Sequence, residues 1–145
     1  MSAGYSGTPL WKKLGVKEGG TLVLLNAPAG FGPELGELPA GAKISAKLAA
    51  NTGLAVLFCK DRATLEKQLP AASAKLHRDG ALWISWPKKS SKLFLDLTED
   101  GIRDVVLPTG LVDVKVCAVN DDWSGLKLMV RKELRARWNG SGDKT

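Results

Sequence analysis

The stretch Ala81-Leu-Trp-Ile-Ser-Trp-Pro-Lys-Lys89 decides how the rest of the chain is organised. Its first seven residues are apolar or β-prone, which predicts a strand buried on both faces that ends at its proline. The end of this strand places four residues at one edge of a sheet: Trp86, Pro87, Lys88 and Lys89. Because neighbouring side chains alternate across a sheet, Trp83 and Trp86 are expected to face opposite sides, one under each helical layer.

Earlier segments of the chain predict further strands of the same sheet. Thr21–Leu25 and Leu54–Cys59 are continuous apolar runs, as expected of strands buried on both faces. Between them, Ala42–Leu48 alternates apolar and polar residues and predicts an edge strand. Ahead of all three, Thr8 and Pro9 are expected to open a short helix, as its N-cap and its first residue.

The segment 61–80 predicts a helix that leads into the strand at 81–87. Its N-cap is Asp61, and its apolar stripe consists of Leu65, Leu69, Ala72 and Leu76. Pro70 is expected to kink or split the helix, and Gly80 to be its C-cap, with His77 near the helix C-terminus. Strand, helix and strand in this order make a right-handed βαβ unit.

The remaining residues predict a helix and a closing hairpin. Thr98 caps a helix whose first turn holds Glu99 and Asp100. Val112–Val119 and Leu126–Arg131 then predict an antiparallel hairpin, in whose first strand one face carries Val112, Val114, Val116 and Ala118. With strands numbered along the chain, we predict the order 2-1-3-4-6-5, with the last pair antiparallel.

Together these elements predict an α/β fold: a three-layer, Rossmann-like open sheet, mostly parallel, closing with a C-terminal antiparallel hairpin. We expect a single domain at 1–138 and a disordered tail at 139–145. No apolar run approaches the ~20 residues that span a bilayer, and we expect no secretory signal. Cys59 and Cys117 fall in apolar strands and are expected to be buried and reduced, which indicates a cytoplasmic protein.

The order of elements resembles the later half of the Rossmann-like fold of S-adenosylmethionine-dependent methyltransferases. In those enzymes a Gly-Gly-x-Leu strand ending near Pro-Lys precedes a helix and a hairpin, and here Asp79–Lys88 corresponds to it. The resemblance covers about residues 21–132 at the level of topology. A cofactor-binding member needs a glycine-rich turn after the first strand and an acid after the next. Asn26–Gly32 and Ala49–Asn51 supply neither, so the resemblance implies a reduced version of the fold. Binding of S-adenosylmethionine or a nucleotide is therefore possible but is not supported by a glycine-rich motif.

At finer grain the chain resembles a family of small bacterial proteins known as a domain of unknown function. The stretches that carry this resemblance are Gly4–Leu10, Leu24–Pro28, Ala81–Lys89, Asp96–Asp100, Gly110–Ala118 and Trp123–Lys127. The resemblance supports the expected fold and implies no chemistry.

A candidate ligand site lies where the strands end. In an open α/β sheet, ligands bind beyond the carboxyl ends of the strands, where the strand order reverses. The loops expected there supply an amide, a glycine-containing turn, lysines and an indole: Asn26, Gly30, Lys60, Trp86, Lys88 and Lys89. These groups suit an anionic or aromatic ligand such as a nucleotide or a phosphorylated metabolite. The alternative is that the indole packs beneath a helix and the lysines are only solvated.

No complete catalytic or metal-binding set is visible in the sequence. Cys59 ends a strand, whereas His77, the single histidine, is expected at the opposite edge of the sheet, so no Cys–His pair is predicted. Helix capping explains the acidic residues Asp96, Glu99 and Asp100.

The net charge of +6 is compatible with an anionic partner, and the simpler interpretation is a solvated surface with a basic tail. We interpret the chain as a non-catalytic binding or regulatory module that binds an anionic small molecule or an acidic protein segment. Two alternatives stay open: an enzyme like the S-adenosylmethionine-dependent methyltransferases, and a protein that binds nucleic acid without sequence specificity. The second is disfavoured because no recognised nucleic-acid motif is present.

Overall fold

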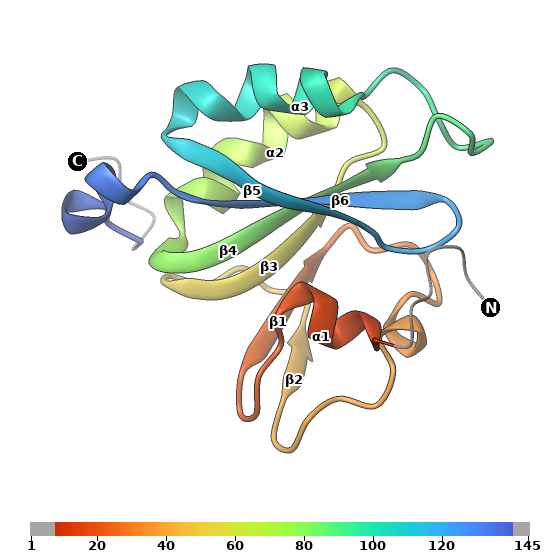
Figure 1. Cartoon of the computed structure of the whole chain (residues 1–145). Helices are drawn as coiled ribbons and strands as arrows, with labels where there is room; N and C mark the ends of the chain where they lie inside the picture. Colours follow the sequence, from red (N-terminus) through yellow and green to blue (C-terminus); the bar gives the residue numbers. More distant parts are fainter. Residues whose placement is uncertain (1–7, 141–145) are drawn as a thin grey trace.

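One six-stranded sheet organises the molecule in the computed structural model, which describes residues 8–140 (Figure 1). The strand order is β2-β1-β3-β4-β6-β5; β1 to β4 are parallel, and β6 is antiparallel to β4 and β5. The predicted open α/β sheet, its strand order and its antiparallel closing hairpin are therefore confirmed. The strands are β1 Thr21–Leu25, β2 Lys43–Ser45, β3 Thr52–Phe58, β4 Leu76–Pro87, β5 Leu111–Ala118 and β6 Trp123–Val130.

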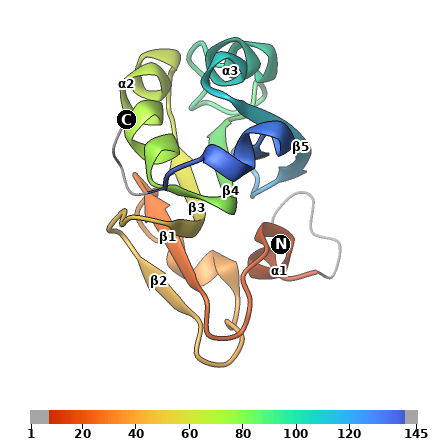
Figure 2. The same cartoon turned by 90° about the vertical axis from the view of Figure 1, so that its left-hand side faces the viewer.

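Helical elements cover both faces of the sheet. Figure 2 shows α2 and α3 together on one face, and α1 on the other. Their bounds, with those of the 3-10 helices, are α1 Leu10–Leu14, η1 Gly32–Leu35, α2 Arg62–Ala74, α3 Glu99–Val106, η2 Leu107–Thr109 and η3 Lys132–Arg137. Within the described part of the chain, none of the helices has the length and hydrophobicity needed to cross a membrane.

β4 lies between β3 and β6 and is buried from Gly80 to Pro87. Trp83 and Trp86 face opposite sides, as predicted: Trp86 belongs to the core beneath α2 and α3, and Trp83 to the core beneath α1. The Nε1–H of Trp83 donates to the carbonyl of Leu14 at 3.0 Å, which ties α1 to the sheet. Both covering layers therefore depend on indoles of this one strand.

The helix before β4 ends earlier than predicted, at Ala74. Three residues expected in its last turn or at its C-cap belong to β4 instead: Leu76, His77 and Gly80. The chain enters the sheet because the N–H of Thr52 donates to the carbonyl of Lys75 at 2.9 Å, which begins the pairing of β3 with β4. His77 is thus not a helix C-terminal residue, and its Nδ1 accepts from the N–H of Asp79 at 3.0 Å.

Pro70 does not split α2, so of the two predicted effects, a kink or a split, the split is wrong. The helix continues through it as one element, and Asp61 caps it as predicted by accepting from the N–H of Thr64 at 2.9 Å. Pro70 lies on the exposed side, beside the equally exposed Glu66, whose carbonyl loses its helical partner to the proline. Because both residues are exposed, the lost hydrogen bond lies on the solvent side of the helix.

The helix caps follow the predictions in part. Pro9 occupies the N-cap position of α1 without a side-chain hydrogen bond, so Thr8 does not cap this helix. Gly15 ends α1 with a φ of 99°, which favours glycine. Thr98 caps α3 as predicted, since its Oγ1 accepts from the N–H of Gly101 at 3.1 Å.

The two edge strands are less regular than predicted. β2 has three residues rather than the seven expected. In β5 the register shifts between Asp113 and Lys115, and this irregularity breaks the apolar alternation. On this edge strand Val114 and Val116 are 50% and 47% exposed. A bulge and a lysine on an edge strand oppose pairing with a further sheet.

The last described residues pack on the beginning of β4. Trp138 Nε1 donates to the carbonyl of Leu76 at 3.0 Å, and the N–H of Asn51 donates to the carbonyl of Gly140 at 2.7 Å. Of the tail predicted at 139–145, residues 141–145 lie outside the described residues, as does the segment 1–7 in which no secretory signal was expected.

We predict that Gly80→Ala lowers the free energy of unfolding by about 1–3 kcal/mol. A Cβ at Gly80 would lie 2.9 Å from the carbonyl oxygen of Gly53 and 3.0 Å from that of Thr52, so the β3 backbone must shift. Urea denaturation measures the change. The matched control is Gly53→Ala, whose Cβ would have nothing within 4 Å and should cost less than about 0.5 kcal/mol. Equal losses in the two variants would contradict this reason for the glycine.

Candidate functional site

The carboxyl ends of β1, β3 and β4 lie at one edge of the sheet, because these strands are parallel. β1 is followed by β2 on one side, whereas β3 and β4 lie on its other side, so the strand order reverses between β1 and β3. Open α/β sheets bind ligands at such a switch point. Asn26 follows β1 and Lys60 follows β3, which brings both residues to this position.

The structure divides the predicted site residues between two pockets. The switch-point pocket, of about 500 Å3, is lined among others by Asn26, Phe58, Lys60, Thr64, Gln68 and Trp123. The β4-end pocket, of about 430 Å3, is lined among others by Trp86, Lys88, Lys89, Glu99, Asp100 and Ser124. Gly30 is exposed, with a φ of 78°, and lines neither of these pockets. Asn26 and Lys60 therefore come together, as do Trp86, Lys88 and Lys89, but the two groups do not form one site.

Asn26 links the end of β1 to both β3 and α2. Its φ of 61° lies in the left-handed region, which asparagine tolerates better than most residues. Its Nδ2 donates to Gln68 Oε1 at 2.6 Å and to the carbonyl of Phe58 at 3.3 Å. The amide thus holds three elements together at the pocket that it lines.

Aromatic rings and one cation set the chemistry of the switch-point pocket. Phe58 and Trp123 pack edge to face, with ring centroids 5.3 Å apart. Lys60 is exposed, and among the described residues that line the pocket it alone carries a charge. The neighbouring carboxylate of Asp61 is occupied as the N-cap of α2. Hydrogen bonds from Thr64, assisted by the charge of Lys60, hold the pKa of Asp61 below its ordinary value.

In the β4-end pocket, lysines and carboxylates come from different elements. Lys88 and Lys89 follow β4, whereas Glu99 and Asp100 form the first turn of α3. Trp86 is only 6% exposed and also belongs to the core beneath the helices. The indole therefore packs beneath the helices, which is the alternative interpretation of this residue. Only a small part of it is exposed to the pocket.

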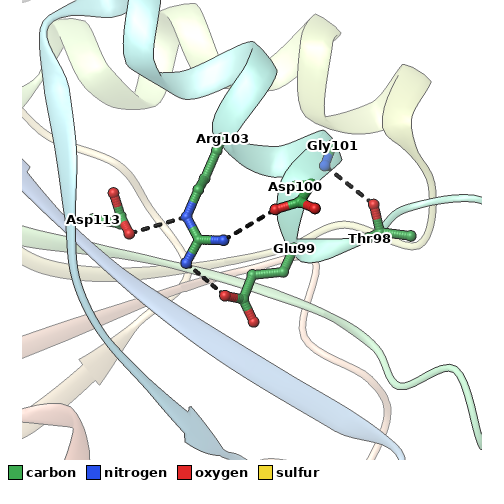
Figure 3. A network of polar contacts seen from close by, with 6 residues as sticks. All are labelled: Thr98, Glu99, Asp100, Gly101, Arg103 and Asp113. Atoms are coloured by element: carbon green, nitrogen blue, oxygen red, sulfur yellow. Dashed lines mark hydrogen bonds and ion pairs between the residues drawn. The ribbon is translucent and has the colours of Figure 1, made fainter.

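Arg103 joins α3 to β5 through three carboxylates (Figure 3). Its Nε donates to Asp113 Oδ2 at 3.0 Å, its Nη1 to Asp100 Oδ1 at 3.3 Å, and its Nη2 to Glu99. The hydrogen bond with Asp113, followed by that with Glu99, raises the pKa of Arg103, and the pKa of Asp113 is lowered chiefly by Arg103. Helix capping is therefore an incomplete explanation of these two acids of α3, since both also pair with this guanidinium.

The cysteines and the histidine lie apart. Cys59 is buried, and burial raises the pKa of its thiol to about 12, with Asp61 adding to the effect. Burial also raises the pKa of Cys117, which is half-buried. His77 lies near the beginning of β4, at the edge of the sheet opposite to Cys59. Within residues 8–140, no group of three or more histidine, cysteine or acidic side chains is placed to hold a metal ion.

Several residues that line the switch-point pocket are not predicted from the sequence. Thr64 and Gln68 lie four residues apart and so on one side of α2, and this polar pair beside the apolar stripe is the one available signal. Trp123 gives no such signal, because the return strand of the hairpin is predicted to begin only at Leu126, whereas β6 begins at Trp123.

Comparison with known proteins supports the fold. No protein-family model and no curated protein sequence matches the chain. A SAM-dependent methyltransferase from Aquifex aeolicus matches with a TM-score of 0.52 and 13% identity, over 83% of this chain and 87% of that chain. The glycopeptide N-methyltransferase MtfA complexed with sinefungin matches with a TM-score of 0.51 and 12% identity, over 82% of this chain and 83% of that one. The chain thus has a methyltransferase-like fold, and this distant likeness shows the fold alone.

We predict that iodoacetamide alkylates Cys117 well before Cys59 in the native protein. Cys59 remains a protonated, buried thiol at pH values far below its pKa of about 12, and only a thiolate reacts. Peptide mass spectrometry at about pH 8 measures both rates, with Cys117 as the internal control. Faster labelling of Cys59 would contradict the placement of this residue.

The same pKa has a consequence for stability. The ordinary value of 9.0 lies below the folded value of about 12, so the unfolded chain releases this proton first as the pH rises. The contribution of Cys59 to stability is complete below about pH 9 and is lost as the pH rises toward 12.

Proposed function

We propose that this chain is a non-catalytic binding module of methyltransferase-like fold that binds an anionic heteroaromatic molecule of the nucleotide class in the switch-point pocket. The observation that carries the proposal is the position of the pocket between Asn26, after β1, and Lys60, after β3, where the strand order reverses. Its volume of about 500 Å3 falls within the range of small-molecule sites.

The chemistry of the lining supports such a ligand. Lys60 supplies positive charge to the pocket, beside the N-terminus of α2 that Asp61 caps. Phe58 and Trp123 are largely buried and give this pocket an apolar floor on which the edge of a base can rest. Asn26 Oδ1 and Gln68 Nε2 have no protein partner within residues 8–140, so they offer an acceptor and a donor to a ligand.

The absence of acid–base chemistry among the described lining residues supports binding rather than catalysis. Lys60 is the titratable group that lines the pocket, and the nearby Cys59 thiol stays protonated because of its raised pKa. A regulatory role, in which ligand binding changes the affinity for another partner, is compatible with this chemistry.

A second candidate is a methyltransferase that uses S-adenosylmethionine. It is favoured by the likeness to solved methyltransferases, one of them in complex with sinefungin. Three local features oppose it. The Asn26–Gly32 turn is not glycine-rich in the required pattern, the β1–β2 connection contains only the short η1, and no acid closely follows β2 to bind ribose hydroxyls. The positive charge of Lys60 also disfavours a sulfonium ligand.

We also propose a cytoplasmic location and membership of the bacterial family of unknown function that the sequence resembles. The location is supported by two free cysteines, Cys59 and Cys117, since thiols stay reduced in the cytosol. The membership rests on the sequence stretches alone.

We predict that ADP binds this protein and that Lys60→Gln weakens its binding about tenfold, because a charge-assisted hydrogen bond is lost. Isothermal titration calorimetry measures both dissociation constants. Lys67→Gln is the matched control, because it removes the same charge from an exposed position of α2 and should leave the affinity unchanged. Asn26→Gly keeps the positive φ but removes the two amide hydrogen bonds, and should also weaken binding.

Two results would overturn the proposal. One is the absence of any calorimetric signal or rise in melting temperature with ADP or AMP. The other is an equal loss of affinity in Lys60→Gln and Lys67→Gln. Binding of S-adenosylmethionine without binding of either nucleotide would replace the proposal with the second candidate.

A further inference from the structure

The β4-end pocket is lined by charges of opposite sign that come from two different elements. Lys88 and Lys89 project from the turn after β4, and Glu99 and Asp100 from the first turn of α3. The buried Trp86 also lines the pocket. This pocket is separate from the switch-point pocket, and nothing in the proposed function depends on it.

No ion pair crosses this pocket within residues 8–140. Glu99 and Asp100 pair with Arg103, whereas neither Lys88 nor Lys89 pairs with any acid of the described chain. The opposite charges therefore face the same cavity of about 430 Å3 without neutralising one another. A gap of this kind has room for a ligand that contacts both sides.

The acidic side retains negative charge in spite of Arg103. One guanidinium serves three carboxylates, those of Glu99, Asp100 and Asp113, so the group as a whole is negative (Figure 3). The side chain of Asp100 is 96% exposed and remains accessible to a cationic group. The guanidinium fixes the positions of the carboxylates without removing their charge.

The basic side is also held in place. The N–H of Lys88 donates to the carbonyl of Asp122 at 2.8 Å, and its carbonyl accepts from the N–H of Ser91 at 3.0 Å. Ser91 Oγ donates to Asp122 Oδ1 at 2.8 Å. The lysine turn is thus fastened to the β5–β6 turn, so the pocket does not have to order this backbone when a ligand binds.

We infer that the β4-end pocket binds a zwitterion, of the class of free α-amino acids. Lys88 and Lys89 receive the carboxylate, and Glu99 and Asp100 receive the ammonium group. A phosphate or nucleotide is repelled by the two acids, and a polyamine by the two lysines. A zwitterion satisfies both sides, and the cavity leaves space for a large side chain next to Trp86.

The test uses the whole chain and the twenty common L-amino acids as probes. Binding is followed at about 10 mM by chemical-shift changes in ¹⁵N-labelled protein, and the best binder is compared with its N-acetyl and methyl ester derivatives. Each derivative lacks one of the two charges. We expect both to bind at least about tenfold more weakly, with the shifts of the parent centred on Lys89, Gly101 and the Trp86 indole.

Charge-neutral variants separate this site from other surfaces. Lys89→Gln and Asp100→Asn should each weaken binding about tenfold. The matched controls Lys92→Gln and Asp104→Asn, at exposed positions outside the pocket lining, should leave it unchanged. Lys60→Gln should also leave it unchanged, which distinguishes this site from the switch-point pocket. Melting temperatures close to that of the unmodified chain show that the variants fold.

Three outcomes would overturn the inference. The first is that no amino acid shifts these resonances at about 10 mM, which corresponds to a dissociation constant too weak for a built site. The second is that the derivatives bind as tightly as the parent. The third is that the pocket variants and their controls behave alike.

Discussion

β4 is buried on both faces, and most of the molecule is arranged to satisfy that constraint. Residues from Gly80 to Pro87 have almost no exposed surface, so each face needs its own apolar cover. α2 and α3 supply one cover. On the other face the large indole of Trp83 donates its N–H to the Leu14 carbonyl, and a buried donor without an acceptor costs about 1–3 kcal/mol. The place of the short helix α1 is therefore determined by one side chain of the central strand.

The edge of the sheet carries two pockets instead of one, because their lining residues come from two different helices. Trp123 and Ser124 are neighbours at the beginning of β6, and adjacent side chains of a strand face opposite sides of a sheet. Trp123 lines the switch-point pocket, and Ser124 lines the β4-end pocket. Ser85 Oγ donates to the carbonyl of Ser124 at 2.9 Å, which holds β4 against β6 between the two cavities. The remaining lining residues come from α2 in the switch-point pocket and from α3 in the β4-end pocket, so the two pockets differ in charge.

The periodicity of apolar residues is sufficient to predict the order of the strands, but it does not predict where each helix or strand ends. Leu76 is apolar and buried whether it lies in a helix or a strand, so the pattern does not locate the end of α2. Gly80 suits a helix C-cap equally well, although its true role is a close approach to Gly53. The sequence likewise places Trp86 and Asn26 at the same edge. The sequence contains no information on how far apart these residues lie along that edge, so it suggests one site where the structure has two.

The methyltransferase-like fold determines where a crevice forms, whereas local residues determine which kind of ligand the crevice can bind. The switch point follows from strand order alone and persists here. The connection after β1, however, contains only the four-residue 3-10 helix η1, so it lacks the α-helix N-terminus that commonly receives an anionic group. Positive charge lies instead on Lys60, where β3 passes into α2, on the other side of the crevice. In the proposed binding mode a ligand held by this charge is oriented toward α2, so the departure from the usual pattern concerns the orientation of the ligand and leaves the fold unchanged.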